Sequence, residues 1–151
     1  SVLHADVTQA IITAFHQVYD EMGLGFLESV YERAMAHALE DLGAHVQRQV
    51  SLEALFRGHI VGEFKPDLLV EDKVLVELKA CRALVPAHDA QILNYLRASE
   101  YEVGMVANFG PKPVFRRFVY ANSRKHRPRG PAQRAPASAR GQNAERQAPS
   151  A

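Results

Sequence analysis

The run FKPDLLVEDKVLVELKA predicts a tight antiparallel hairpin, because two apolar segments flank a short charged stretch around Asp72. A turn centred on Asp72 brings Asp67 opposite Glu77. Side chains directly opposite each other in such a pair lie about 5 Å apart at Cβ, where two like charges are destabilising. A divalent cation would remove that repulsion, so the hairpin predicts a metal site. The same register pairs Val70 with Val74, Leu69 with Leu75, and Leu68 with Val76.

The second strand of this hairpin carries a lysine close to the two carboxylates. Residues two apart on a strand share a face, so Glu77 and Lys79 point to the same side while Leu78 points into apolar packing on the other. The chemistry is therefore expected on one face of the sheet. An alternative is a surface ion-pair cluster in which Lys79 only offsets the carboxylate repulsion.

Length and composition indicate one domain of an ordinary globular protein, with 151 residues of which 47% are hydrophobic. Apolar runs are strand-sized and none approaches the ~18 residues of a membrane-spanning helix, so we expect a cytoplasmic protein without membrane association. Cys81 is the single cysteine, and no Cys/His set has zinc-like spacing.

Charge is distributed unevenly along the chain. Residues 121–151 carry seven Lys or Arg and one Glu, whereas residues 1–120 carry eleven Lys or Arg and sixteen Asp or Glu. The C-terminal segment lacks apolar periodicity, which predicts a folded domain over 1–120 and a disordered basic tail over 121–151. Basic tails often contact nucleic acid, although a solubilising extension has the same composition.

The hydrophobic periodicity predicts a mixed α/β fold. Apolar residues follow helical spacing over 7–22, 27–42 and 86–99, and strand-like segments occur at 46–54, 60–69, 73–80, 103–109 and 114–120. The expected order is two helices, three strands as a meander, one helix and two strands (ααβββαββ). Such an order favours a mixed sheet flanked by helices.

Several motifs together resemble one protein family. The dipeptide PD at 66–67 and the triplet ELK at 77–79 fit a PD…ExK signature, and GFLESVY at 25–31 fits a GxxExxY pattern. With AHDAQILNYL at 87–96, the chain resembles the bacterial GxxExxY group of the PD-(D/E)XK nuclease superfamily, which has a restriction-endonuclease-like fold. The resemblance covers nearly all of residues 7–120.

This resemblance implies roles for the hairpin residues. Asp67 and Glu77 would bind Mg²⁺ or Mn²⁺, and Lys79 would orient or activate the attacking water. Glu28, in the GxxExxY segment, would be a further metal ligand. A Glu in the first turn of a helix also interacts favourably with the helix dipole, which is the alternative for Glu28.

Further residues are implied as contacts to the substrate. Gln91 and Tyr95 resemble a QxxxY element, in which Gln91 would steady Lys79 or the scissile phosphate. His88 lies one turn before Gln91 and would carry a proton or contact phosphate, unless it only starts the helix. Tyr31 is expected beside the site, with its ring in the core.

The implied activity is Mg²⁺-dependent hydrolysis of phosphodiester bonds in DNA or RNA. An alternative is a non-catalytic nucleic-acid-binding or adaptor module that keeps the fold and acts through a protein partner, because fold alone does not fix function. A third is hydrolysis of a small phosphorylated molecule.

Overall fold

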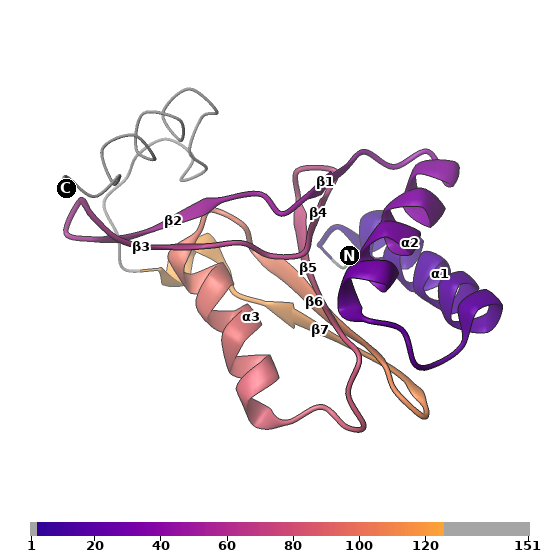
Figure 1. Cartoon of the computed structure of the whole chain (residues 1–151). Coiled ribbons are helices and arrows are strands. Elements are labelled where there is room, and N and C mark those ends of the chain that lie inside the picture. The colour runs from indigo at the N-terminus through magenta and orange to yellow at the C-terminus, as the bar shows by residue number, and fades with distance from the viewer. Residues whose placement is uncertain (1–2, 126–151) are drawn as a thin grey trace, which may run out of the picture.

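The structure, a computed structural model, describes residues 3–125 and has the mixed α/β class expected from the sequence (Figure 1). Its α-helices are α1 (Ala5–Met22), α2 (Glu28–Asp41) and α3 (Pro86–Ala98). Its strands are β1 (Val46–Arg48), β2 (Leu52–Phe56), β3 (His59–Phe64), β4 (Leu68–Val70), β5 (Val74–Lys79), β6 (Val103–Phe109) and β7 (Pro113–Val119).

Five of the strands form the main sheet, in the order β1-β4-β5-β6-β7. Only β5 and β6 run parallel to each other within this sheet, and α3 connects them. A parallel pair needs such a crossover because its strands must start at the same edge. Strands β2 and β3 pair only with each other and form a two-stranded ribbon.

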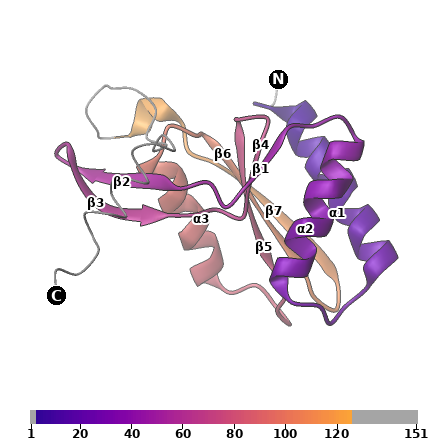
Figure 2. The same cartoon turned by 45° about the horizontal axis from the view of Figure 1, so that its top comes forward.

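The main sheet separates two hydrophobic cores. Helices α1 and α2 cover one face, whereas α3 and the ribbon lie on the opposite side (Figure 2). Alternation along β5 divides its side chains, because Val76 and Leu78 join the α1–α2 core while Leu75 joins the α3 core. Glu77 and Lys79 therefore project on the side of α3.

Helix α3 lies close to the sheet at Gly104 on β6. A Cβ atom at this position would be 2.7 Å from Cγ1 of Ile92 on α3. Since Ile92 is fully buried, a larger residue at 104 would push α3 away from the strands. The absence of a side chain at Gly104 thus keeps α3 next to the face that carries Glu77.

The predicted three-stranded meander is wrong in one respect. The segments 46–54 and 60–69 are each divided into two strands, which changes the order from ααβββαββ to ααβββββαββ. Gln49 has a positive φ of 54° after β1 ends, and Pro66 precedes β4. Proline has no N–H to donate to a strand ladder. The two segments therefore leave the main sheet together and continue as the ribbon.

The register predicted for the second hairpin is confirmed. All three expected pairs are present between β4 and β5, and the turn has the three residues 71–73. Glu71 and Asp72 both have positive φ, at 54° and 50°. An odd number of turn residues keeps Asp67 and Glu77 on the same side of the strands.

The last described residues belong to the fold. Asn122–Arg124 form a short 3-10 helix, and Lys125 Nζ donates hydrogen bonds to the carbonyls of Ser99 (3.0 Å) and Tyr101 (2.6 Å). The disordered tail predicted from residue 121 therefore does not include these first residues. The remainder of that prediction, residues 126–151, lies outside the described part of the chain.

Candidate active site

The carboxylates of Asp67 and Glu77 lie just beyond the end of the β4–β5 ladder. The backbone N–H of Asp67 donates to Oε1 of Glu77 (3.0 Å), and the N–H of Leu78 donates to Oδ2 of Asp67 (2.7 Å). Each side chain is thus anchored on the opposite strand. One oxygen of each carboxylate is held by the backbone, which leaves the other oxygen directed to other partners.

Burial changes the protonation of both groups. Glu77 is only 5% exposed, and this burial, with the adjacent Asp67 charge, raises its pKa to about 8. The pKa of Asp67 is also raised by burial, although the N–H of Leu78 opposes the shift. Taking a carboxylate out of water disfavours its charged form, and a second nearby carboxylate adds to the effect. A nearby positive charge would therefore stabilise the ionised forms of these two carboxyl groups.

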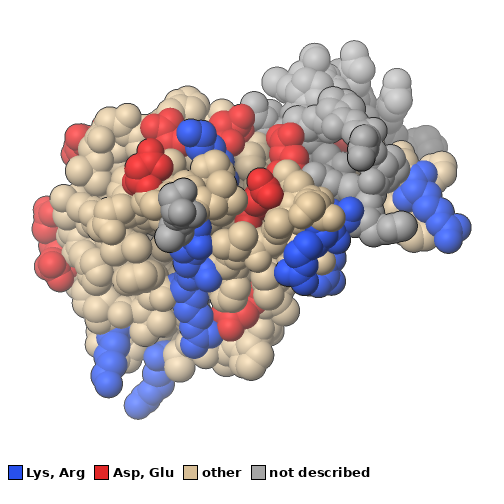
Figure 3. All heavy atoms as spheres, turned by 180° about the vertical axis from the view of Figure 1, so that it is seen from behind, with Lys and Arg blue, Asp and Glu red and all other residues tan. Residues whose placement is uncertain are grey.

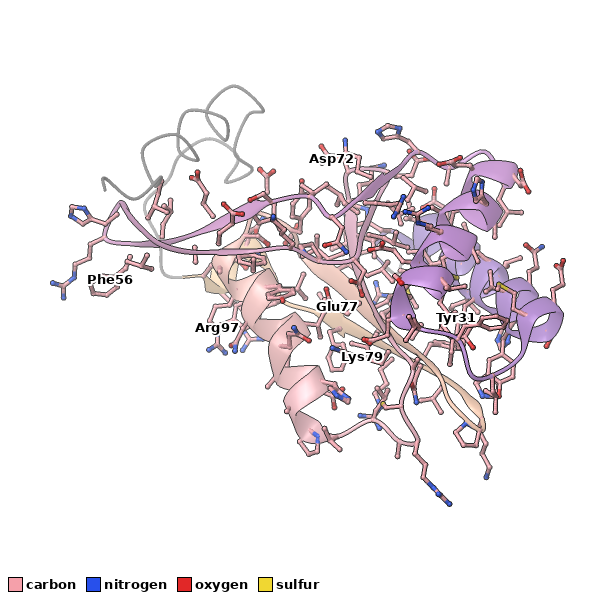
Figure 4. The ribbon with its side chains drawn as sticks, viewed as in Figure 1. Tyr31, Phe56, Asp72, Glu77, Lys79 and Arg97 are labelled. Carbon is pink, nitrogen blue, oxygen red and sulfur yellow. The ribbon has the colours of Figure 1, made fainter. Side chains whose placement is uncertain are left out.

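Lys79 supplies one such charge. It lies on the same face of β5 as Glu77, beside α3 (Figure 4), and its charge lowers the pKa of both Asp67 and Glu77. The strand end after Lys79 is fixed by Asn108, whose side chain donates to the carbonyl of Cys81 (2.9 Å) and accepts from its N–H (3.0 Å). Lys79 is therefore held in register beside the carboxylates.

Glu28 approaches this group from the first turn of α2. It is exposed, and its charge raises the pKa of Asp67 and of Glu77. Charges influence each other in this way only over short distances. Glu28 therefore lies within electrostatic reach of Asp67 and Glu77.

A comparison with protein families matches residues 5–118 to the family described as the PD-(D/E)XK nuclease superfamily. The chain belongs to this superfamily. Pro66-Asp67 and Glu77-Leu78-Lys79 fit the sequence pattern after which this superfamily is named. The finer resemblance to the GxxExxY group remains a resemblance. Searches of curated proteins and of solved structures gave no match.

Membership in the PD-(D/E)XK superfamily supports a nuclease-like function and implies nucleic-acid binding in general. Nucleases of this superfamily generally depend on divalent metals. Within residues 3–125, no helix has both the length and the apolar character needed to cross a membrane.

Two of the predicted residues on α3, Gln91 and Tyr95, form a hydrogen-bonded pair. Nε2 of Gln91 donates to the hydroxyl of Tyr95 (2.9 Å). Of the two roles expected for Gln91, a contact to Lys79 is not seen among the described residues, and the contact to the scissile phosphate stays a prediction. The Tyr95 ring stacks on Phe64 of the ribbon with 4.4 Å between centroids. Burial, and then the charge of Glu77, raise the pKa of Tyr95. Tyr95 therefore lies within electrostatic reach of the carboxylates.

His88 has a structural contact at the start of α3. Its Nδ1 accepts a hydrogen bond from the N–H of Val85 (3.2 Å), which satisfies a donor at the helix N-terminus. Nε2 of the half-buried ring is left for another partner. His88 therefore does have the contact at the helix start that the alternative expected, made by Nδ1. Its Nε2 is still available for the predicted substrate contact, which stays a prediction.

Tyr31 does not have the placement expected of a substrate contact. It is fully buried, its ring stacks on Phe109 with centroids 4.0 Å apart, and its position on α2 is seen in Figure 4. Its hydroxyl donates to the carbonyl of Gly23 (2.6 Å) and accepts from the N–H of Phe26 (3.3 Å). We assign it to anchoring the loop between α1 and α2.

Glu32 and Gln49 are two residues near the site that the sequence did not indicate. Glu32 is 5% exposed on α2, and its charge raises the pKa of Asp67. Nε2 of Gln49 donates to the Glu32 carboxylate and, at 3.4 Å, to Oδ1 of Asp67. The signal available in the sequence was the spacing of Glu32, one helical turn after Glu28.

Proposed function

We propose that this protein hydrolyses phosphodiester bonds of DNA or RNA with the help of Mg²⁺ or Mn²⁺. The observation that supports this most is the pairing of Asp67 and Glu77, two largely buried carboxylates fixed by backbone N–H groups with Lys79 on the same face. Outside functional sites, like charges are rarely buried side by side, because the arrangement costs stability.

The donor set fits the proposed cation. Carboxylate oxygens suit Mg²⁺, which keeps several waters and commonly needs only one or two carboxylates from the protein. Asp67 and Glu77 would hold the ion, and Glu28 would be the further ligand from α2. When bound, such a cation lowers the pKa of a coordinated water and stabilises negative charge on a phosphoryl group.

Other residues have roles that do not require metal ligation. Lys79 would orient the attacking water and stabilise the charge that develops in the transition state. Gln91, tied to Tyr95, would contact the scissile phosphate from α3. Nε2 of His88 would bind a neighbouring phosphate, because Nδ1 already accepts the Val85 N–H.

A second candidate function is a non-catalytic nucleic-acid-binding or adaptor module. Among the described residues, no three His, Cys, Asp or Glu side chains are already gathered around one point as a metal site. Surface charge does not distinguish an enzyme from an adaptor. On the face shown in Figure 3, acidic and basic side chains both occur, and the described residues form no single broad basic patch there. If the protein is a nuclease, Glu28 or water molecules must therefore complete the coordination of the cation held by Asp67 and Glu77.

Cleavage assays separate these functions. Full-length protein is incubated with labelled single- and double-stranded DNA and RNA in Mg²⁺, in Mn²⁺ and in EDTA. We expect metal-dependent cleavage of at least one substrate by the wild type and none by Asp67→Ala. Binding of nucleic acid without cleavage by the wild type in either metal would instead support the adaptor.

A further inference from the structure

Gln49 has an unusual backbone conformation directly beside Asp67. Its φ of 54° lies in the left-handed region, which residues other than Gly, Asn and Asp seldom adopt. Its N–H donates to the backbone carbonyl of Asp67 (3.1 Å), one step beyond the last β1–β4 pair. Strained conformations persist where the surrounding structure holds them, and they concentrate at functional sites.

The side chain of Gln49 connects two carboxylates. Nε2 donates to Oε1 of Glu32 and to Oδ1 of Asp67 (3.4 Å). The other oxygen of Glu32 accepts from Nη2 of Arg48 (3.2 Å). A glutamine amide carries two hydrogens and no net charge, so it can donate to both acids at once, whereas a carboxylate at this position could donate to neither.

We propose that Gln49 is a positioning residue for Asp67, and that buried Glu32 in turn fixes the Gln49 amide. Gln49 restrains Oδ1 of Asp67 from one side, while the N–H of Leu78 restrains Oδ2 from the other. Both oxygens are then oriented before a cation binds. The proposal rests on the metal-binding function proposed for Asp67 and adds residues that act through it.

Three substitutions of Gln49 separate its backbone role from its side-chain role. Gln49→Gly suits the positive φ but removes the amide. Gln49→Asn tolerates the same φ and keeps an amide that is one methylene too short to span both acids. Gln49→Glu keeps the length and replaces the donor by a third negative charge. Arg57→Gly is the matched control, because Arg57 also has a positive φ (51°) and lies at the ribbon turn.

Mn²⁺ affinity of the full chain, measured by electron paramagnetic resonance, is the main readout, with melting temperature measured in parallel. Loss of a group that orients a metal ligand typically weakens binding by about 10- to 100-fold. We expect a weakening of this size in all three Gln49 variants and in Glu32→Ala, which removes the acceptor of the Gln49 amide, without a lower melting temperature in Gln49→Gly, and no change in Arg57→Gly. Unchanged affinity in Gln49→Gly, or tighter binding in Gln49→Glu, would overturn the proposal.

A second readout needs no metal. The side-chain NH₂ resonances of Gln49 should shift in both Glu32→Gln and Asp67→Asn if the amide bridges the two acids. Resonances that respond to neither substitution would overturn the bridge while leaving the proposed function intact. Wild-type protein that binds no Mn²⁺ would overturn the proposed function, and the positioning role with it, even if the bridge is observed.

Discussion

The backbone N–H of Asp67 donates to the side chain of Glu77, and the Asp67 side chain accepts from the residue that follows Glu77. The two acids are therefore fixed by main-chain groups on neighbouring strands rather than by flexible side chains. A site whose ligands are held in advance loses less conformational freedom when it binds. Placing two carboxylates side by side away from water also lowers the stability of the metal-free fold, and the first two predictions follow from this cost.

Addition of Mg²⁺ or Mn²⁺ should stabilise the folded protein. A ligand that binds only the folded state adds about 2.7 kcal/mol when its free concentration is 100 times its Kd. Asp67→Asn should abolish the rise in melting temperature, whereas Asp20→Asn, an exposed position on α1, should keep it. Thermal-shift titration measures the effect, and an equal rise in wild type and Asp67→Asn would place the cation elsewhere.

Metal-free protein should lose stability as the pH rises. Glu77 has its ordinary pKa of 4.5 in the unfolded chain and a pKa of about 8 in the fold, so folding favours its protonated form. This contribution to stability is fully present below about pH 4.5 and is lost as the pH rises through about 8.

Urea unfolding in EDTA between pH 5 and 9 tests this dependence, since Glu77→Gln should show a flatter profile across that range. The variant keeps a side-chain oxygen for the Asp67 N–H. Glu71→Gln, exposed in the β4–β5 turn, should retain the wild-type profile. If the stability of the metal-free wild type instead rises with pH, the raised pKa of Glu77 in the folded protein is contradicted.

Lys79→Ala should separate metal binding from catalysis. We expect Mn²⁺ binding to persist, while kcat falls by about 100- to 1,000-fold, the usual loss when one group that stabilises the transition state is removed. Lys73→Ala removes an exposed lysine from the nearby turn and should keep full activity. A Lys79→Ala variant with normal kcat would restrict Lys79 to offsetting the carboxylate charges.

Tyr31→Phe should destabilise the fold without affecting substrate binding directly. The ring can still stack on Phe109, but the bonds to Gly23 and Phe26 are lost, at a cost of about 1–2 kcal/mol. Chemical denaturation measures the change, with Tyr120→Phe as the control. A higher KM at unchanged stability would return Tyr31 to the substrate site.

Two truncations test where the fold ends. A chain that stops after residue 121 lacks the Lys125 contacts to Ser99 and Tyr101, whereas a chain that stops after residue 125 keeps them. We expect the shorter chain to be less stable by about 1–3 kcal/mol, because it loses the two hydrogen bonds donated by charged Lys125 and the two that Asn122 makes to Glu100 and Glu102. Equal melting temperatures would show that these contacts contribute little.

The helices and the β4–β5 hairpin could be predicted from local patterns. Helical spacing located α1, α2 and α3 within about two residues at each end, and the charged turn around Asp72 set the register correctly. Both features depend on residues close in sequence. The proximity of Asp67 to Glu77 follows from the same register.

The strand breaks and the Glu32–Gln49 contact could not be predicted in the same way. Alternation with a period of two continues through Gln49 and does not indicate which sheet a strand joins. Pro66 was the one local signal of a break, because proline cannot donate within a ladder. Glu32 is an ordinary helical residue until the chain brings Gln49 against it.

Gln49 follows β1 and Asp67 precedes β4, so both lie where the chain passes between the main sheet and the ribbon. Phe56 marks the far end of β2 in that ribbon (Figure 4). A rotation of the ribbon relative to the sheet would have to be accommodated in the short connections 49–51 and 65–67, which contain these two residues. A molecule bound to the ribbon and a cation held by Asp67 would therefore both act on these connections. Thermodynamic linkage makes any such influence mutual, so a ligand bound to the ribbon and a cation held by Asp67 would each change the affinity of the protein for the other.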